Sequence, residues 1–173
     1  MGLDMNLYRE VILTDSMKLV GSKGEAVEKI INEGEKDEHS KVRLVVHNSV
    51  CYWRKFNALH KYFNDHFNSH DDDNCVDMYM DIDDLRKLLL DLKNLRKQIK
   101  LNEDGIVENQ EICEEILPPE DGFFFGSTAL DKYYVEDIDD TIEKLSGVID
   151  DHAKLVEAGV DEYDINYYYR AWY

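Results

Sequence analysis

The sequence is poor in proline, glycine and cysteine, and it contains no long hydrophobic run. Its 173 residues include two Pro, nine Gly and three Cys. An odd number of cysteines without a CxxC pair argues against a disulfide framework and against a cysteine-based zinc site. The longest apolar runs are too short to span a bilayer, and the N-terminus lacks the basic and apolar segments of a secretory signal. We therefore expect a cytoplasmic protein that does not bind a membrane.

The chain has the length and composition of one folded domain. Hydrophobic residues make up 43% and aromatic residues 11% of the sequence, which excludes ordinary disorder and supplies enough apolar side chains for a sizeable core. No segment is rich enough in Gly, Ser or Pro to serve as a linker. Residues 1–173 are therefore predicted to form a single domain.

Short alternating segments and longer segments with helical spacing predict a mixed fold. Alternation of apolar and polar residues, or a high content of β-branched residues, predicts strands at 3–13, 42–47, 76–80 and 165–173. Apolar residues three and four positions apart predict helices at 21–34, 51–67, 81–101 and 137–158. Because these elements do not form regular βαβ units, we expect an α+β fold, with a single small antiparallel or mixed sheet and helices packed mainly on one face.

Negative charge is concentrated in one third of the chain. The net charge is −18 at pH 7, and residues 101–164 hold 20 acidic residues but only three lysines. Such a segment repels nucleic acid and anionic membranes, and it attracts cationic surfaces such as those of nucleic-acid-binding proteins. A solvated acidic helix face can also serve solubility alone. The segment predicts either a partner-binding surface or a solubilising one.

A second group of candidate residues lies on the helix predicted at 51–67. On a helix, Trp53, Asn57 and His60 share one face. An aromatic ring, an amide and an imidazole on one line suit a nucleotide base, and Arg54 beside them suits a phosphate. The alternative is that Trp53 and His60 belong to the core, because aromatic stripes on helices are usually packing surfaces.

A glycine-flanked aromatic loop supplies further candidates. Residues 122–128 read GFFFGST and end in Ser127 and Thr128. A loop of this kind can present backbone N–H groups to an anion. It is not a Walker loop, because no lysine follows the second glycine.

A metal site and an enzyme active site are both weakly indicated. His66 and His70 are four residues apart, and Asp73 or Cys75 would complete a set of ligands if the helix extended so far. The polar residues at 68–74 favour a solvated, helix-ending turn instead. No G-x-S-x-G motif and no recognisable nucleophile–base arrangement are present. We therefore expect no metal, no cofactor and no catalytic residues, and we rank a hydrolase or transferase using His60 last.

Five segments, taken in order, resemble a group of small uncharacterised proteins encoded by bacteriophages and prophages. They are Gly2–Met5 (GLDM), Tyr52–His60 (YWRKFNALH), Asp73–Cys75 (DNC), Gly122–Thr128 (GFFFGST) and Tyr169–Trp172 (YRAW). The resemblance touches both ends and the middle of the chain. It implies a phage product made in a bacterial cytoplasm, a setting in which small acidic proteins often block host defences by occupying nucleic-acid-binding surfaces.

Two functions from different classes follow. The first is an acidic, nucleic-acid-mimicking inhibitor of a basic host defence protein such as a CRISPR effector, with no direct nucleic-acid binding of its own. Its partner-binding residues would be the carboxylates predicted along one helix: Glu136, Asp137, Asp139, Asp140, Glu143, Asp150 and Asp151. The second is a small-ligand binder, such as a sponge for a nucleotide defence signal. Its site would consist of Trp53, Arg54, Asn57, His60, Ser127 and Thr128.

Overall fold

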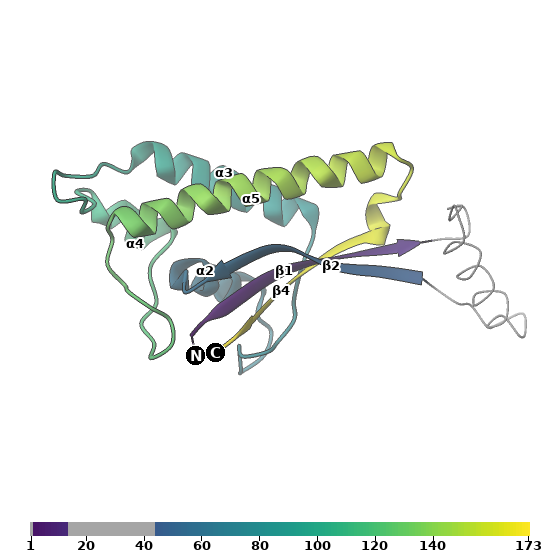
Figure 1. Cartoon of the computed structure of the whole chain (residues 1–173), viewed down its shortest axis with the longest axis horizontal. Coiled ribbons are helices and arrows are strands. Elements are labelled where there is room, and N and C mark those ends of the chain that lie inside the picture. The colour runs from purple at the N-terminus through teal and green to yellow at the C-terminus, as the bar shows by residue number, and fades with distance from the viewer. Residues whose placement is uncertain (1, 14–43) are drawn as a thin grey trace, which may run out of the picture.

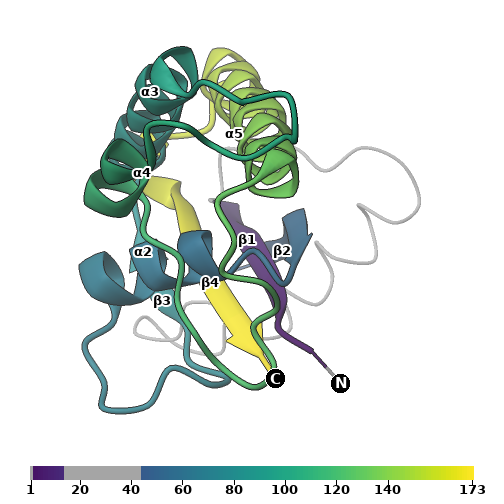
Figure 2. The ribbon, with the colours of Figure 1, turned by 90° about the vertical axis from the view of Figure 1, so that its left-hand side faces the viewer.

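Four strands of this computed structural model form one antiparallel sheet that lies beneath a layer of helices (Figure 1; Figure 2). The structure describes residues 2–13 and 44–173. The sheet order is β2-β1-β4-β3. The strands are β1 (Asp4–Leu13), β2 (Leu44–Arg54), β3 (Met78–Met80) and β4 (Ile165–Trp172). The predicted α+β fold is confirmed, and the sheet is antiparallel throughout.

Within residues 2–13 and 44–173, the helices follow β2 in the chain. They are α2 (Asn57–Phe67), α3 (Ile82–Gln98), α4 (Gln110–Ile116) and α5 (Lys132–Glu157), and a 3-10 turn, η1 (Glu162–Asp164), leads into β4. The helix predicted at 21–34 and the start of the strand predicted at 42–47 lie outside the described residues.

Strand β4 shows how the sheet meets the helix layer. Its burial alternates along the strand, as the sequence predicts, and Tyr167 and Tyr169 are fully buried. The Tyr167 hydroxyl lies 3.1 Å from Nδ1 of His152 on α5. The Tyr169 ring stacks on Phe63 of α2 with the ring centroids 4.2 Å apart. Helices α2 and α5 therefore pack against the same face of the sheet, and that interface holds the core.

Helix α5 is the long outer element of this layer. Asp131 caps its N-terminus by accepting hydrogen bonds from the backbone N–H groups of Tyr133 and Tyr134. Apolar side chains at helical spacing bury one face, whereas most of the polar residues on the opposite face are exposed. At about 1.5 Å per residue, its 26 residues extend roughly 39 Å. Figure 1 shows α5 lying alongside α3 above the sheet.

Two element boundaries differ from the sequence prediction. The helix predicted from residue 51 begins at Asn57, because residues 51–54 continue β2 and pair with β1. Within those residues Cys51 and Trp53 are buried and Tyr52 and Arg54 are exposed, which is the alternation of a strand. Helix α5 begins at Lys132 and not at 137. Asp131, directly before Lys132, is a residue type that often caps the start of a helix.

Candidate functional site

Segments far apart in the sequence meet at one end of the sheet, where β1 begins and β4 ends (Figure 1). The backbone N–H of Leu3 donates to the carbonyl of Phe124 at 3.0 Å, and the N–H of Lys55 donates to the carbonyl of Leu3 at 2.8 Å. The N–H of Cys75 donates to the carbonyl of Ala171 at 2.8 Å. These contacts link Leu3 with Phe124 and Lys55, and separately Cys75 with Ala171.

Asn57 organises the aromatic loop at this end. Its side chain is buried, and its Nδ2 donates to the carbonyls of Phe125 at 3.3 Å and Ser127 at 2.8 Å. Its Oδ1 accepts a hydrogen bond from the backbone N–H of Glu120 at 3.2 Å. Because donors and acceptor are all engaged by the loop, the Asn57 amide fixes the loop and is not free to bind a ligand.

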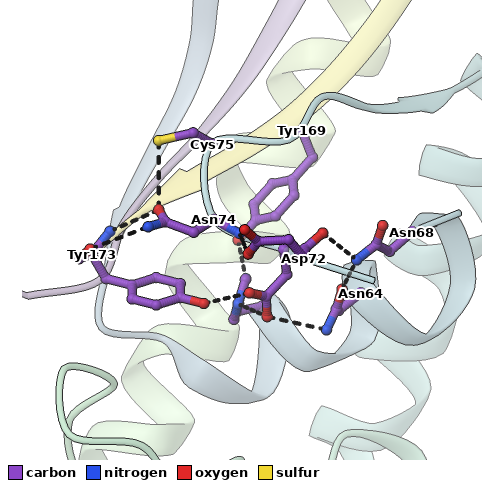
Figure 3. Close-up of polar contacts among 9 residues, drawn as sticks. Asn64, Asn68, Asp72, Asn74, Cys75, Tyr169 and Tyr173 are labelled. Carbon is purple, nitrogen blue, oxygen red and sulfur yellow. Dashed lines mark hydrogen bonds and ion pairs between the residues drawn. The ribbon is translucent and has the colours of Figure 1, made fainter. Parts of the chain in front are cut away.

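His60 belongs to a polar cluster that joins α2, β4 and the loop before β3. Figure 3 shows Asn64 of α2, Asp72 and Asn74 of that loop, and Tyr169 and Tyr173 lying together. Its side chain is completely buried, and its Nδ1 lies 2.8 Å from the hydroxyl of Tyr169. Its Nε2 lies 3.3 Å from Oδ2 of Asp73, although the two atoms are not aligned for a hydrogen bond. Asp73 also accepts hydrogen bonds from the Tyr173 hydroxyl and from Asn64 Nδ2. The cluster ties the 68–75 loop and the end of β4 to α2.

Burial decides the charge of His60. Desolvation lowers the pKa of His60, and the nearby carboxylate of Asp73 opposes that effect only in part. A neutral ring that accepts a hydrogen bond from the Tyr169 hydroxyl at Nδ1 carries its proton on Nε2, on the side of Asp73. With no exposed surface, the imidazole contributes to structure and does not face a substrate.

The six residues of the predicted nucleotide site do not share one open surface. Trp53 lies on β2 and is buried, with the Lys144 ammonium 5.6 Å from its ring, and His60 is buried. Arg54 is exposed, and its Nε lies 3.9 Å from Asp4. Asn57 and Ser127 border one cavity, whereas Thr128 borders a second cavity that Ile106 and Pro118 also line.

The cavity beside Asn57 and Ser127 lies between the end of β2, the loop after the aromatic segment and the first turns of α5. Its volume is about 320 Å³. The lining residues are Lys55, Phe56, Asn57, Ser127, Ala129, Asp131, Tyr133, Tyr134 and Asp137. Aromatic rings and two carboxylates thus share its wall. Asp131 and Tyr133 are not among the site residues predicted from the sequence. A phosphate placed here would meet like charge.

Asp137 is the carboxylate of this cavity whose protonation the fold changes most. Burial, and then the neighbouring charges of Asp140 and Glu136, raise its pKa from 3.8 to about 6, and Lys144 opposes the shift. No hydrogen bond or ion pair joins Asp137 to another residue within 2–13 or 44–173 through its carboxylate. Above its pKa, Asp137 is therefore a half-buried negative charge without a partner among these residues.

Replacing Asp137 with Asn is expected to stabilise the fold at neutral pH. The raised pKa means that the fold favours the protonated carboxyl, so ionisation above about pH 6 destabilises the folded state relative to the unfolded one. We expect a gain on the order of 1 kcal/mol at pH 7.5, discounted because the group is half exposed, and no gain at about pH 3.5, below both pKa values. Urea unfolding at the two pH values measures it, with Glu143→Gln, an exposed position on the same helix, as the control. A pH-independent effect would contradict the assignment.

The predicted partner-binding carboxylates lie along α5. Asp137 is half-buried, and the other six are exposed: Glu136, Asp139, Asp140, Glu143, Asp150 and Asp151. Three of the six form surface ion pairs, namely Asp139 with Arg96 at 2.7 Å, Asp140 with Lys144 at 2.7 Å and Asp151 with Lys154 at 2.8 Å. The remaining three have no ion-pair partner within the part of the chain that the structure describes.

The residues considered as metal ligands do not converge. His66 is exposed, and its Nδ1 contacts the carbonyl of Tyr62 at 2.8 Å instead of turning toward His70. Asp73 is held by Tyr173 and Asn64. Across residues 2–13 and 44–173, no three side chains of the metal-binding types come together.

No protein-family model, curated protein or solved structure matches the chain. In the described residues, no helix combines the length and the apolar character needed to cross a membrane.

Proposed function

We propose that the chain is a non-enzymatic inhibitor that occupies the basic groove of a nucleic-acid-binding defence protein of a bacterial host, such as a CRISPR effector. The carboxylates of α5 take the positions that phosphates of DNA or RNA would occupy. The mechanism is competition, because a groove filled by α5 is closed to its nucleic acid.

The observation that carries this proposal is the linear charge density of α5. Seven carboxylates lie between Glu136 and Asp151, a distance of roughly 22 Å along the helix axis. That is about one negative charge per 3.7 Å, close to the roughly 3.4 Å spacing of charges along one DNA strand. Lys144 is the one base within that stretch. A groove built to neutralise phosphates meets a similar density of charge on this helix.

The ion pairs on α5 leave this surface available. Each joins exposed side chains at the protein surface, where such a pair contributes about 0–1 kcal/mol. In each of these pairs a carboxylate faces one cation, whereas a groove that carries several arginines and lysines would surround it with more than one. The pairs can therefore open when the partner binds.

Neighbouring elements define the extent of the acidic surface. Helix α3 packs against α5 on one side and carries exposed bases such as Lys93 and Lys97. On the other side Lys144 Nζ donates to the carbonyl of Tyr52, on the edge strand β2. The acidic surface therefore runs along α5 itself, and a partner would contact this one helix and not the whole helix layer.

Nucleotide binding, the other function derived from the sequence, gains no support from the arrangement of its residues. The indole of Trp53 and the imidazole of His60 are buried, and the Asn57 amide is committed to the aromatic loop. We therefore do not propose a nucleotide site at Trp53, Asn57 and His60.

The proposal is tested by charge reversal at the three α5 acids without a described ion-pair partner. The triple variant Glu136→Lys, Glu143→Lys and Asp150→Lys is expected to lose at least about tenfold in its ability to displace DNA from purified CRISPR effectors, because like charges would then face each other in the groove. Fluorescence anisotropy of labelled DNA measures the displacement.

A matched control separates position from net charge. Glu103→Lys, Asp104→Lys and Glu108→Lys change the charge equally on an exposed loop that borders the first residue of α5 but lies outside the stretch from Glu136 to Asp151. This variant is expected to displace DNA nearly as well as the unchanged chain. Equal losses in both variants, or a loss in neither, would contradict the proposal.

A further inference from the structure

The cavity at the start of α5 opens beside the acidic surface. Asp137 belongs both to the seven α5 carboxylates and to the cavity wall. The exposed face of α5 and the roughly 320 Å³ hollow are therefore continuous at this residue. A macromolecule seated on α5 would cover the mouth of the cavity, so the residue that fills it belongs to the same interface.

The wall of the cavity combines negative charge with aromatic surface. The Asp137 carboxylate has no hydrogen-bond or ion-pair partner among the described residues. Tyr133 is 61% exposed with the Lys132 ammonium 4.9 Å from its ring centroid, so its ring already receives one cation, and Phe56 and Tyr134 add buried aromatic surface to the wall. Asp131 adds a second carboxylate, although its Oδ1 is occupied by the helix cap. This wall suits a cation with an apolar stem.

Lys55 borders the cavity without cancelling this charge. Its side chain runs past Gly126, where an added Cβ would lie 3.1 Å from Lys55 Cβ, and continues to Gly2, where an added Cβ would lie 2.8 Å from Lys55 Cε. The ammonium group therefore lies toward the start of the chain. The backbone φ of Lys55 is 61°, and Gly126 beside it has a φ of 96°, so both residues hold the left-handed conformation that brings them together.

We propose, on the basis of the function proposed above, that this cavity receives an arginine side chain of the nucleic-acid-binding partner. The guanidinium would form an ion pair with Asp137 and stack on Tyr133, and its stem would contact the aromatic wall. Arginine fits better than lysine because its planar group binds carboxylate with two donors, stacks on rings and is less strongly hydrated than an ammonium group. Arginines of nucleic-acid grooves normally contact phosphates. An arginine bound in this cavity could therefore no longer contact a phosphate of the nucleic acid.

A titration with small probes tests the cavity without the partner. N-acetyl-arginine amide is added to isotope-labelled protein, and backbone amide shifts are followed by NMR. Saturable shifts are expected around Ser127, Asp131 and Asp137, and binding should weaken about tenfold or more in Asp137→Asn but not in Glu157→Gln, an exposed position at the end of the same helix. The uncharged analogue N-acetyl-citrulline amide should produce no saturable shift. N-acetyl-lysine amide should bind more weakly than the arginine probe.

The outcomes separate this inference from the function on which it rests. No saturable shift at the cavity, equal shifts with the citrulline probe, equal binding of the lysine probe, or unchanged binding in Asp137→Asn would each overturn it. If the arginine probe fails while the α5 charge reversal still abolishes DNA displacement, only the cavity assignment is wrong. If the probe binds as expected and the chain displaces no DNA, the proposed function is wrong.

Discussion

Replacing His60 with Ala is expected to lower the free energy of unfolding by roughly 3 kcal/mol. The imidazole is completely buried, so its removal leaves a cavity between α2 and β4. The Tyr169 hydroxyl loses its 2.8 Å contact in a fully buried position, and Asp73 loses the nearest cation-capable group. Urea unfolding at pH 7.5 measures the loss.

A second histidine on the same helix provides the control. His66 is exposed; its Nδ1 contacts the carbonyl of Tyr62 in the preceding turn, and its ring stacks on the Tyr62 ring with the centroids 4.2 Å apart. His66→Ala should therefore change the free energy of unfolding by less than about 1 kcal/mol. Similar losses in the two variants would show that the buried cluster does not stabilise the fold.

The His60 cluster also makes stability depend on pH. Burial lowers the pKa of His60 below its ordinary value of 6.5, so the unfolded chain takes up a proton at a higher pH than the folded chain does. The stability that the neutral ring contributes is complete above about pH 6.5 and is lost as the pH falls toward the folded-state pKa. Between about pH 7.5 and 5 the unchanged protein should lose more stability than His60→Ala does.

Replacing Asn57 with Ala is the second change with a large expected effect, again roughly 3 kcal/mol. The substitution leaves the Glu120 N–H and the carbonyls of Phe125 and Ser127 without their partner. Phe125 is buried and Glu120 is half-buried, so losing these two hydrogen bonds costs more than the bonds contribute on average, whereas the carbonyl of the exposed Ser127 can be solvated. The loop should also open more often, so limited proteolysis within 118–128 is expected to accelerate.

An exposed asparagine controls for the loss of the amide itself. Asn94 lies on the exposed side of α3, and its side chain forms no hydrogen bond to another described residue. Asn94→Ala should leave stability within about 0.5 kcal/mol of the unchanged protein. If Asn57→Ala unfolds at the same urea concentration as Asn94→Ala, the loop does not depend on Asn57.

The sequence predicts the elements better than it predicts where α2 begins. Trp53, Phe56 and Phe63 fit a helical period, but the shorter run Cys51–Arg54 also alternates between buried and exposed residues. Pairing of β2 with β1 over the full strand decides in favour of the strand. Periodicity in one short segment cannot reveal a partner strand some 45 residues away, so tertiary pairing overrides the local pattern.

The candidate site shows the same division between local and long-range information. The charge of α5 could be read from the sequence because acids at three-, four- and seven-residue spacing, such as Glu136, Asp140, Glu143 and Asp150, must share a helix face. The partners of His60 could not, since Tyr169 lies 109 residues away and meets it only through the sheet order. The cavity likewise depends on Ser127 meeting Asp137 across a loop whose path no sequence pattern specifies.

The rate of association with an inhibited effector, measured against salt concentration, tests the central claim most directly. Between about 0.01 M and 1 M salt the Debye length shrinks from about 30 Å to about 3 Å. If α5 steers the encounter, the rate constant of the unchanged chain should fall steeply over this range, and the Glu136, Glu143 and Asp150 reversal should flatten the slope far more than the Glu103, Asp104 and Glu108 reversal does. Identical slopes for the two triple variants, or a rate that ignores salt, would contradict the account.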